Sequence, residues 1–96
     1  EEITSVVFEE ECAFLYDYAQ KNFVVKNYQI VVERMERVME IDSGYADGAA
    51  MLLLMETYHE LEEAEKAESL YQTIKNEYPD TEVSQRATQI MTGQEE

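Results

Sequence analysis

The sequence predicts an all-α fold in which helical hairpins stack side by side into an array, and three observations favour it. Apolar residues recur at three- and four-residue spacings along most of the 96 residues, the period of a helix with one buried face. The pattern matches itself when the chain is shifted by 36 residues, so that Tyr28 falls on Ala64. The one proline, Pro79, stands where the second hairpin should end. A chain of this length should form one domain with one core.

The first helix is expected from Ile3 to about Asn22. Its apolar residues with helical spacing are Ile3, Val6, Val7, Phe14, Leu15, Tyr18 and Ala19. The β-branched pairs Val6-Val7 and Val24-Val25 are too short, and too poor in flanking turn residues, to favour a strand. Cys12 is the only cysteine, so no intrachain disulfide can form. It has apolar neighbours and no basic residue to activate it, and we expect a buried thiol rather than a reactive one.

The second helix is expected from about Val25 to Ile41, where apolar and charged residues fall on opposite sides of a helical period. Its apolar stripe consists of Tyr28, Val31, Val32, Met35, Val38 and Met39. The residues Asp42-Ser43-Gly44 should end this helix. Asp47 is expected to be the N-cap of the next one, because an aspartate side chain accepts hydrogen bonds from the first helical N–H groups.

The stretch from Asp47 to Pro79 is expected to form a helical hairpin around which the rest of the chain packs. Its first helix is apolar on nearly all sides across Ala49–Met55, so it needs neighbours on several sides. The segment that follows offers one apolar stripe, made of Ala64, Ala67, Leu70, Tyr71, Ile74 and Tyr78. Pro79 ends that segment because proline lacks an N–H and pushes the preceding residue out of the helical region.

A short fifth helix is expected from Val83 to Met91, with fraying after Gly93. The 36-residue shift lays Leu15, Tyr18 and Ala19 onto Met51, Leu54 and Met55, and those onto Ala87, Ile90 and Met91. Such matching indicates stacked units that bury their faces against one another. The single domain, residues 1–96, then comprises a first repeat at about 3–43, a second at 44–79 and a capping helix at 83–92.

Five residues of the second repeat carry a resemblance to a known family: Leu54, Tyr58, Ala67, Tyr71 and Pro79. Their spacing resembles the tetratricopeptide repeat pattern. The chain departs from that pattern at Met55, where a small residue is usual, and at Glu62, where the family has a turn glycine. Ser43 stands in place of the closing proline of the first repeat, and tryptophan is absent.

The stretch Glu77–Thr81, followed by Ala87, also resembles a longer-period variant found in bacterial envelope proteins. These include the BamD-like outer-membrane assembly lipoproteins and the Tol-Pal-associated periplasmic coordinators. This resemblance implies the periplasm or cell envelope as the location, and without it a cytoplasmic location is expected. No stretch has the length of a membrane span and the N-terminus has no leader pattern, so membrane insertion is not expected.

The repeat resemblance implies an α-α superhelix that binds proteins, with the first helix of each hairpin lining a concave groove. The implied groove residues are Tyr16, Asp17, Gln20, Phe23, Leu52, Leu53, Glu56, His59 and Glu60, with Gln85 and Thr88 closing one end. Family members that grip the C-terminal carboxylate of chaperones use Lys, Arg and Asn here, so the carboxylates of Asp17, Glu56 and Glu60 argue against that activity. The expected partner of this scaffold or adaptor is a helix or extended peptide that carries Lys or Arg and an apolar anchor.

The net charge narrows the choice of partners. Twenty-two acidic and seven basic residues give a formal net charge of −15, which repels nucleic acids and anionic membranes and favours basic or neutral proteins. A second interpretation stays open, in which Leu52, Leu53, Tyr16 and Phe23 are core residues or are covered by a second copy in a homodimer. The chain is then a structural self-association module.

Catalytic and cofactor sites are not expected. His59 is the only histidine, and with Glu60 and Glu63 it provides half of a zinc-binding helix, without the second His or a third ligand. The acidic run at 62–65 lacks the alternating oxygen ligands of a calcium loop. The three glycines are scattered, so there is no phosphate-binding loop, and no serine lies in a nucleophile motif. We therefore expect no enzyme activity, no metal and no cofactor.

Overall fold

The computed structural model describes residues 2–93, with side chains from residue 10 onwards. This part of the chain contains no strand; its elements are α1 (Glu2–Val24), α2 (Tyr28–Ile41), the 3-10 helix η1 (Tyr45–Gly48), α3 (Ala49–Glu60), α4 (Ala64–Glu77) and α5 (Glu82–Thr92). The predicted all-α array of helical hairpins is therefore confirmed. Residues 94–96, for which the sequence predicts fraying, lie outside the described residues.

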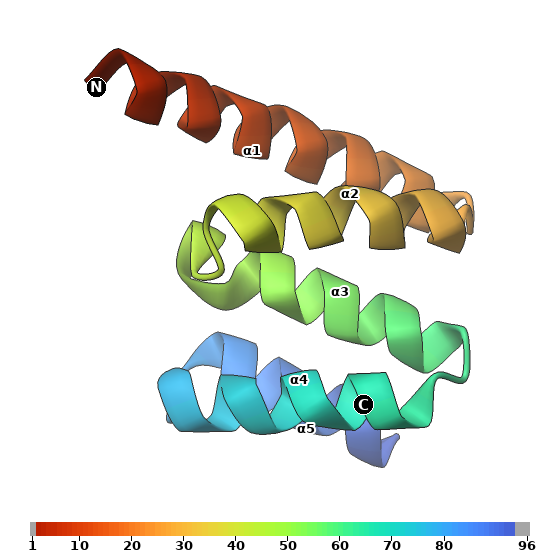
Figure 1. The fold of residues 1–96 in the computed structure, drawn as a ribbon. Coiled ribbons are helices and arrows are strands. Elements are labelled where there is room, and N and C mark those ends of the chain that lie inside the picture. Colours follow the sequence, from red (N-terminus) through yellow and green to blue (C-terminus); the bar gives the residue numbers. More distant parts are fainter. Residues whose placement is uncertain (1, 94–96) are drawn as a thin grey trace.

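The helices follow one another in space much as they do in the sequence (Figure 1). α1 packs on α2, α2 on α3 and α3 on α4, while α5 packs against both α3 and α4. The molecule is elongated, with principal extents of 43 × 30 × 23 Å. Because each helix contacts mainly its neighbours, α1 lies at one end of the array and α4 with α5 at the other.

α3 lies in the middle of the array and is buried over most of its circumference. Its buried side chains are Ala50, Met51, Leu53, Leu54, Met55, Thr57 and Tyr58. The buried Thr57 hydroxyl donates a 2.7 Å hydrogen bond to the Leu53 carbonyl one turn earlier, so its polarity is satisfied within the helix. α2, α4 and α5 all pack against α3, which confirms that this apolar helix needs several neighbours.

The amphipathic helices bury narrower stripes. α2 buries Val31, Met35 and Val38, and α4 buries Ala67 and Ile74. Complete burial of one such aliphatic side chain stabilises a fold by roughly 1.5–3 kcal/mol. Cys12 of α1 joins this core; burial raises the pKa of its thiol, and the carboxylates of Asp42 and Glu11 add to the rise. The buried thiol predicted from the sequence is confirmed.

The two hairpin turns have the same geometry, and they lie 36 residues apart. Lys26 and Glu62 both adopt a left-handed backbone conformation, with φ of 67° and 63°. In the first turn the N–H of Lys26 bonds the Phe23 carbonyl and the N–H of Asn27 bonds the Asn22 carbonyl, at 3.0 and 2.8 Å. In the second turn the N–H of Glu62 bonds the His59 carbonyl and the N–H of Glu63 bonds the Tyr58 carbonyl, at 3.1 and 2.9 Å. Both are Schellman motifs, which satisfy the last carbonyls of a helix.

The link between the two hairpins differs from the expectation. Asp47 is not an N-cap, because its backbone is left-handed (φ 56°) whereas an N-cap residue is extended. Ala46 and Gly48 are left-handed as well, with φ of 58° and 94°. Gly48 occupies the N-cap position of α3 without a side-chain cap. A Cβ at Gly48 would lie 2.9 Å from the ring of Tyr78, so the glycine lets this ring pack against the link.

The other helix ends follow the expected signals with small shifts. α2 begins at Tyr28 rather than near Val25, since residues 25–27 form the turn. α4 ends at Glu77, ahead of Pro79. α5 is capped by Thr81, whose hydroxyl oxygen accepts a 3.2 Å hydrogen bond from the Ser84 N–H.

Candidate functional site

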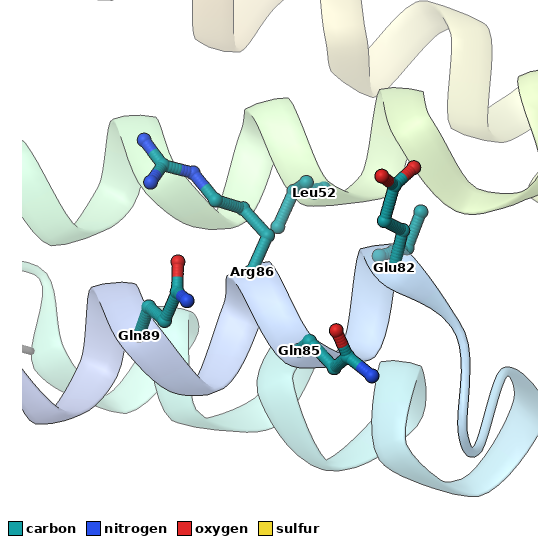
Figure 2. A pocket seen from close by; sticks show the side chains of 6 residues that line it. Leu52, Glu82, Gln85, Arg86 and Gln89 are labelled. Atoms are coloured by element: carbon teal, nitrogen blue, oxygen red, sulfur yellow. The ribbon is translucent and has the colours of Figure 1, made fainter. Parts of the chain in front are cut away.

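A groove of about 480 Å³ lies between α3 and α5 (Figure 2). It is lined by Leu52 of α3 and by Glu82, Val83, Gln85, Arg86 and Gln89 of α5. Leu52 and Val83 are half-buried and form an apolar floor, whereas the polar residues of α5 are exposed around it. An apolar floor with a polar rim is the arrangement found at protein–protein interfaces. We call this feature the α3–α5 groove.

Arg86 connects the two walls of the α3–α5 groove. Its side chain reaches from α5 towards α3 (Figure 2), and its guanidinium lies 3.7 Å from the carboxylate of Glu56. The Arg86 side chain is 45% exposed and Glu56 is partly buried, and a pair that is open to solvent on one side contributes at most about 1 kcal/mol to stability. It also places a cation of the chain itself on Glu56, one of the three carboxylates predicted to attract a basic partner.

A second cluster lies where α1 turns into α2, beside the last turns of α3. The rings of Phe23 and Tyr28 pack at a tilt with 5.4 Å between their centroids. Desolvation raises the pKa of the Tyr28 hydroxyl, and the negative charges of Glu60 and Glu56 raise it further. Phe23, Glu56 and Glu60, which the sequence predicts as groove residues, are thus neighbours of Tyr28, which the sequence predicts only as part of the apolar stripe of the second helix.

Tyr16 lies near the other end of α3, in edge-to-face contact with Tyr45 of η1 at 5.8 Å between centroids. It is half-buried, and burial raises the pKa of its hydroxyl. Further along α1, Gln20 is exposed, and the exposed Asp17 carboxylate pairs with the Lys21 ammonium at 3.1 Å. The Asp17 carboxylate therefore already has a cationic partner on its own helix.

Two of the predicted groove residues belong elsewhere. Leu53 is only 9% exposed and is part of the hydrophobic core, because the face of α3 that carries it packs inside the array. Thr88 faces α4, where its hydroxyl lies 3.2 Å from that of Tyr71. The remaining end residue, Gln85, does line the α3–α5 groove. His59 is exposed in the last turn of α3, outside the residues that line the groove.

The described residues offer no site for a metal ion. Among them, no group of three or more His, Cys, Asp or Glu side chains converges as a metal site requires. In the same part of the chain, no helix has both the length and the apolar character that crossing a bilayer demands.

No protein-family model, characterised protein or solved structure matches this chain. The principal addition of the site to the sequence analysis is the polar face of α5, formed by Glu82, Arg86 and Gln89. These three residues are four and three positions apart, so the sequence did contain the signal for one shared helical face.

Proposed function

We propose that this chain is a non-catalytic protein-interaction module of the tetratricopeptide type, which binds a helix or extended segment of a partner protein along α3. The observation that carries the proposal is the apolar floor of Leu52 and Val83, which stays accessible between α3 and α5. α3 and α5 are among the helices that the repeat resemblance assigns to the binding surface. An accessible apolar floor inside a polar rim provides the anchor that a partner side chain needs.

The partner is a basic amphipathic segment. With a formal net charge of −15, the chain attracts Lys and Arg over a distance and repels acidic peptides. Within the surface, Arg86 already pairs with Glu56, and Lys21 with Asp17. The exposed carboxylate of Glu60, beside the Tyr28 and Phe23 rings, is thus the best position for a basic side chain of the partner. Its apolar anchor lies on Leu52 and Val83.

Titration of a dye-labelled, basic amphipathic peptide tests the proposal. We expect Leu52→Ser and Glu60→Lys each to weaken binding by about tenfold, the effect of one good anchor or charge pair. Glu77→Lys is the matched control, since it makes the same charge change on an exposed residue at the far end of α4. Affinity should also fall with rising salt.

Two outcomes would overturn the proposal. One is the absence of binding for basic, neutral and acidic amphipathic peptides alike. The other is binding that Leu52→Ser and Glu60→Lys affect no more than Glu77→Lys does, because such binding would reflect overall charge rather than this surface.

Self-association is the second candidate function. A specific observation favours it: two aromatic side chains, Phe14 and Tyr18, are exposed on α1 at the end of the array. This surface is distinct from the α3–α5 groove, so the two functions are compatible.

A further inference from the structure

The exposed aromatic side chains of α1 form an ordered patch. Phe14 is 67% exposed and Tyr18 is 37% exposed, and their rings stack with 6.1 Å between centroids and 7° between planes. The guanidinium of Arg34, from α2, lies 5.5 Å from the centre of the Tyr18 ring. We call these three residues the aromatic patch. Large apolar side chains gathered at one place on a surface mark an interaction site.

The internal repeat indicates which face of α1 this is. Thirty-six residues after Phe14 and Tyr18 stand Ala50 and Leu54 of α3, and both are buried, Leu54 with 3% of its surface exposed. α3 lies inside the array, packed on the preceding hairpin through α2 and on α4 and α5. α1 has no preceding hairpin among the described residues, so the same face carries its aromatic residues into solvent.

A hollow of about 540 Å³ lies at the opposite end of the array. It is lined by Ala64, Glu65, Glu68 and Ser69 of α4 and by Met91 of α5. Its surface is mainly apolar, and Glu65 and Glu68 are exposed at its edge. Figure 1 shows α1 and the α4–α5 pair on opposite sides of the molecule. We call this feature the α4–α5 hollow.

Charged side chains at the two surfaces are complementary locally. Arg34 belongs to the aromatic patch, and Glu65 and Glu68 are exposed at the edge of the α4–α5 hollow. The two ends as a whole have the same net charge, because residues 10–41 carry six carboxylates and four basic side chains and residues 64–93 carry five and three. The charge attraction between two copies is therefore confined to these side chains.

We propose that the aromatic patch of one copy docks into the α4–α5 hollow of a second copy, head to tail. Phe14 and Tyr18 meet the apolar lining around Met91, and Arg34 approaches the carboxylates of Glu65 and Glu68. The contact is heterologous: a pair of copies keeps one unused hollow and one unused patch, so association continues into rings or short linear chains. The charge of −15 on every copy opposes association, so we expect it to strengthen as salt rises to about 0.15 M, where long-range repulsion is screened.

Sedimentation velocity from about 10 µM to about 1 mM protein tests this proposal over the range expected for a weak interface. The wild type should show a mass that rises with concentration. Phe14→Ser should remain monomeric, and so should Arg34→Glu and Glu68→Arg, whereas combining the last two changes should restore association through the reversed charge pair. Val24→Ser is the matched control, since Val24 is an apolar residue of α1 outside the patch that is even more exposed than Phe14. Circular dichroism verifies that each variant is folded.

A mixing experiment distinguishes a head-to-tail contact from a symmetric one. Phe14→Ser keeps an intact hollow and Glu68→Arg keeps an intact patch, so their mixture should form a one-to-one dimer that grows no further. A wild type that is monomeric throughout would overturn the proposal. So would full association of Glu68→Arg alone, because two patches would then be binding each other, and so would a mixture that stays monomeric while the wild type associates.

Discussion

The Tyr58 hydroxyl of α3 donates a 2.8 Å hydrogen bond to the Glu36 carboxylate of α2, which joins the two hairpins across their shared interface. On its other side the Tyr58 ring receives the ammonium of Lys66 of α4, 5.4 Å from its centre. One side chain of the central helix therefore contacts both neighbouring helices. Because the acceptor is the ionised Glu36 carboxylate, this hydrogen bond is stronger than one between neutral groups.

Replacing Tyr58 with Phe should lower the free energy of unfolding by about 1–2 kcal/mol, the range for a hydrogen bond to a charged group in a partly exposed setting. The ring, its packing and its contact with Lys66 are retained, so the loss measures the hydroxyl alone. Urea denaturation is the measurement. Glu36→Gln, which keeps an acceptor but removes the charge, should lose less, and an unchanged midpoint for Tyr58→Phe would show that the bond contributes nothing.

The same hydroxyl should make stability depend on alkaline pH. Burial, and then the hydrogen bond and charge of Glu36, raise the pKa of Tyr58 from 10.0 to about 12. A group whose pKa is higher in the folded state than in the unfolded state stabilises the fold fully below the unfolded pKa. The stability difference between the wild type and Tyr58→Phe should be constant up to pH 10 and shrink towards pH 12. Urea denaturation of both proteins across this range measures it, and the other tyrosines cancel in the difference; a constant difference would contradict the assignment.

Glycine at the hairpin turns should stabilise the protein. Lys26 and Glu62 hold left-handed conformations that cost a residue with a side chain about 1 kcal/mol and cost glycine almost nothing. We expect Lys26→Gly and Glu62→Gly each to raise the free energy of unfolding by up to about 1 kcal/mol, despite the greater entropy of glycine in the unfolded chain. Glu33→Gly, in the middle of α2, is the control and should destabilise by about 1 kcal/mol. If all three variants lose stability alike, the turns are not strained.

Gly48→Ala should be among the more damaging single changes. Its φ of 94° strains any side chain, and a Cβ would meet the Tyr78 ring at 2.9 Å, so we expect a loss of about 2–3 kcal/mol. Gly93→Ala is a matched control with a φ of 77° and no atom within 4 Å, and it should lose only about 1 kcal/mol. Thermal or urea unfolding measures the stability of both variants. Equal losses of stability would show that the Tyr78 ring moves aside without an energetic cost.

Arg86→Gln should improve binding of a basic peptide, if the proposed function holds. The substitution removes a positive charge from the rim of the α3–α5 groove, where it repels the Lys and Arg side chains of a basic peptide. We expect stability to change by about 1 kcal/mol at most, since the Arg86 side chain is 45% exposed. Affinity should rise by about threefold or more. Reduced affinity would show that Arg86 itself contacts the partner.

The helices themselves were predictable because periodicity and Pro79 fix them locally. α4 begins 36 residues after α2 and has the same 14 residues in length, as the shift of the sequence against itself implies. The left-handed turns were less predictable. Glycine usually marks them, whereas Lys26 and Glu62 are held there by the hydrogen bonds that close each hairpin.

The site was predictable only in part, because its members depend on which faces meet. Leu52 and Leu53 are neighbours in the sequence, yet the first lines the groove and the second is buried in the core. Tyr18 and Leu54 are equivalent in the repeat, and only position in the array leaves the first exposed. The ion pair between Arg86 and Glu56 joins residues thirty positions apart, so no local sequence pattern could predict it.

Because the two Schellman motifs match, the chain enters α2 after residue 27 and α4 after residue 63 with the same backbone geometry. A duplicate of the segment 28–63, spliced in before Ala64, would meet at each seam the same backbone geometry that is already there. Growth of such a chain by gene duplication therefore requires no newly evolved connection, and its length is set by how many copies are retained rather than by the chemistry of any one of them.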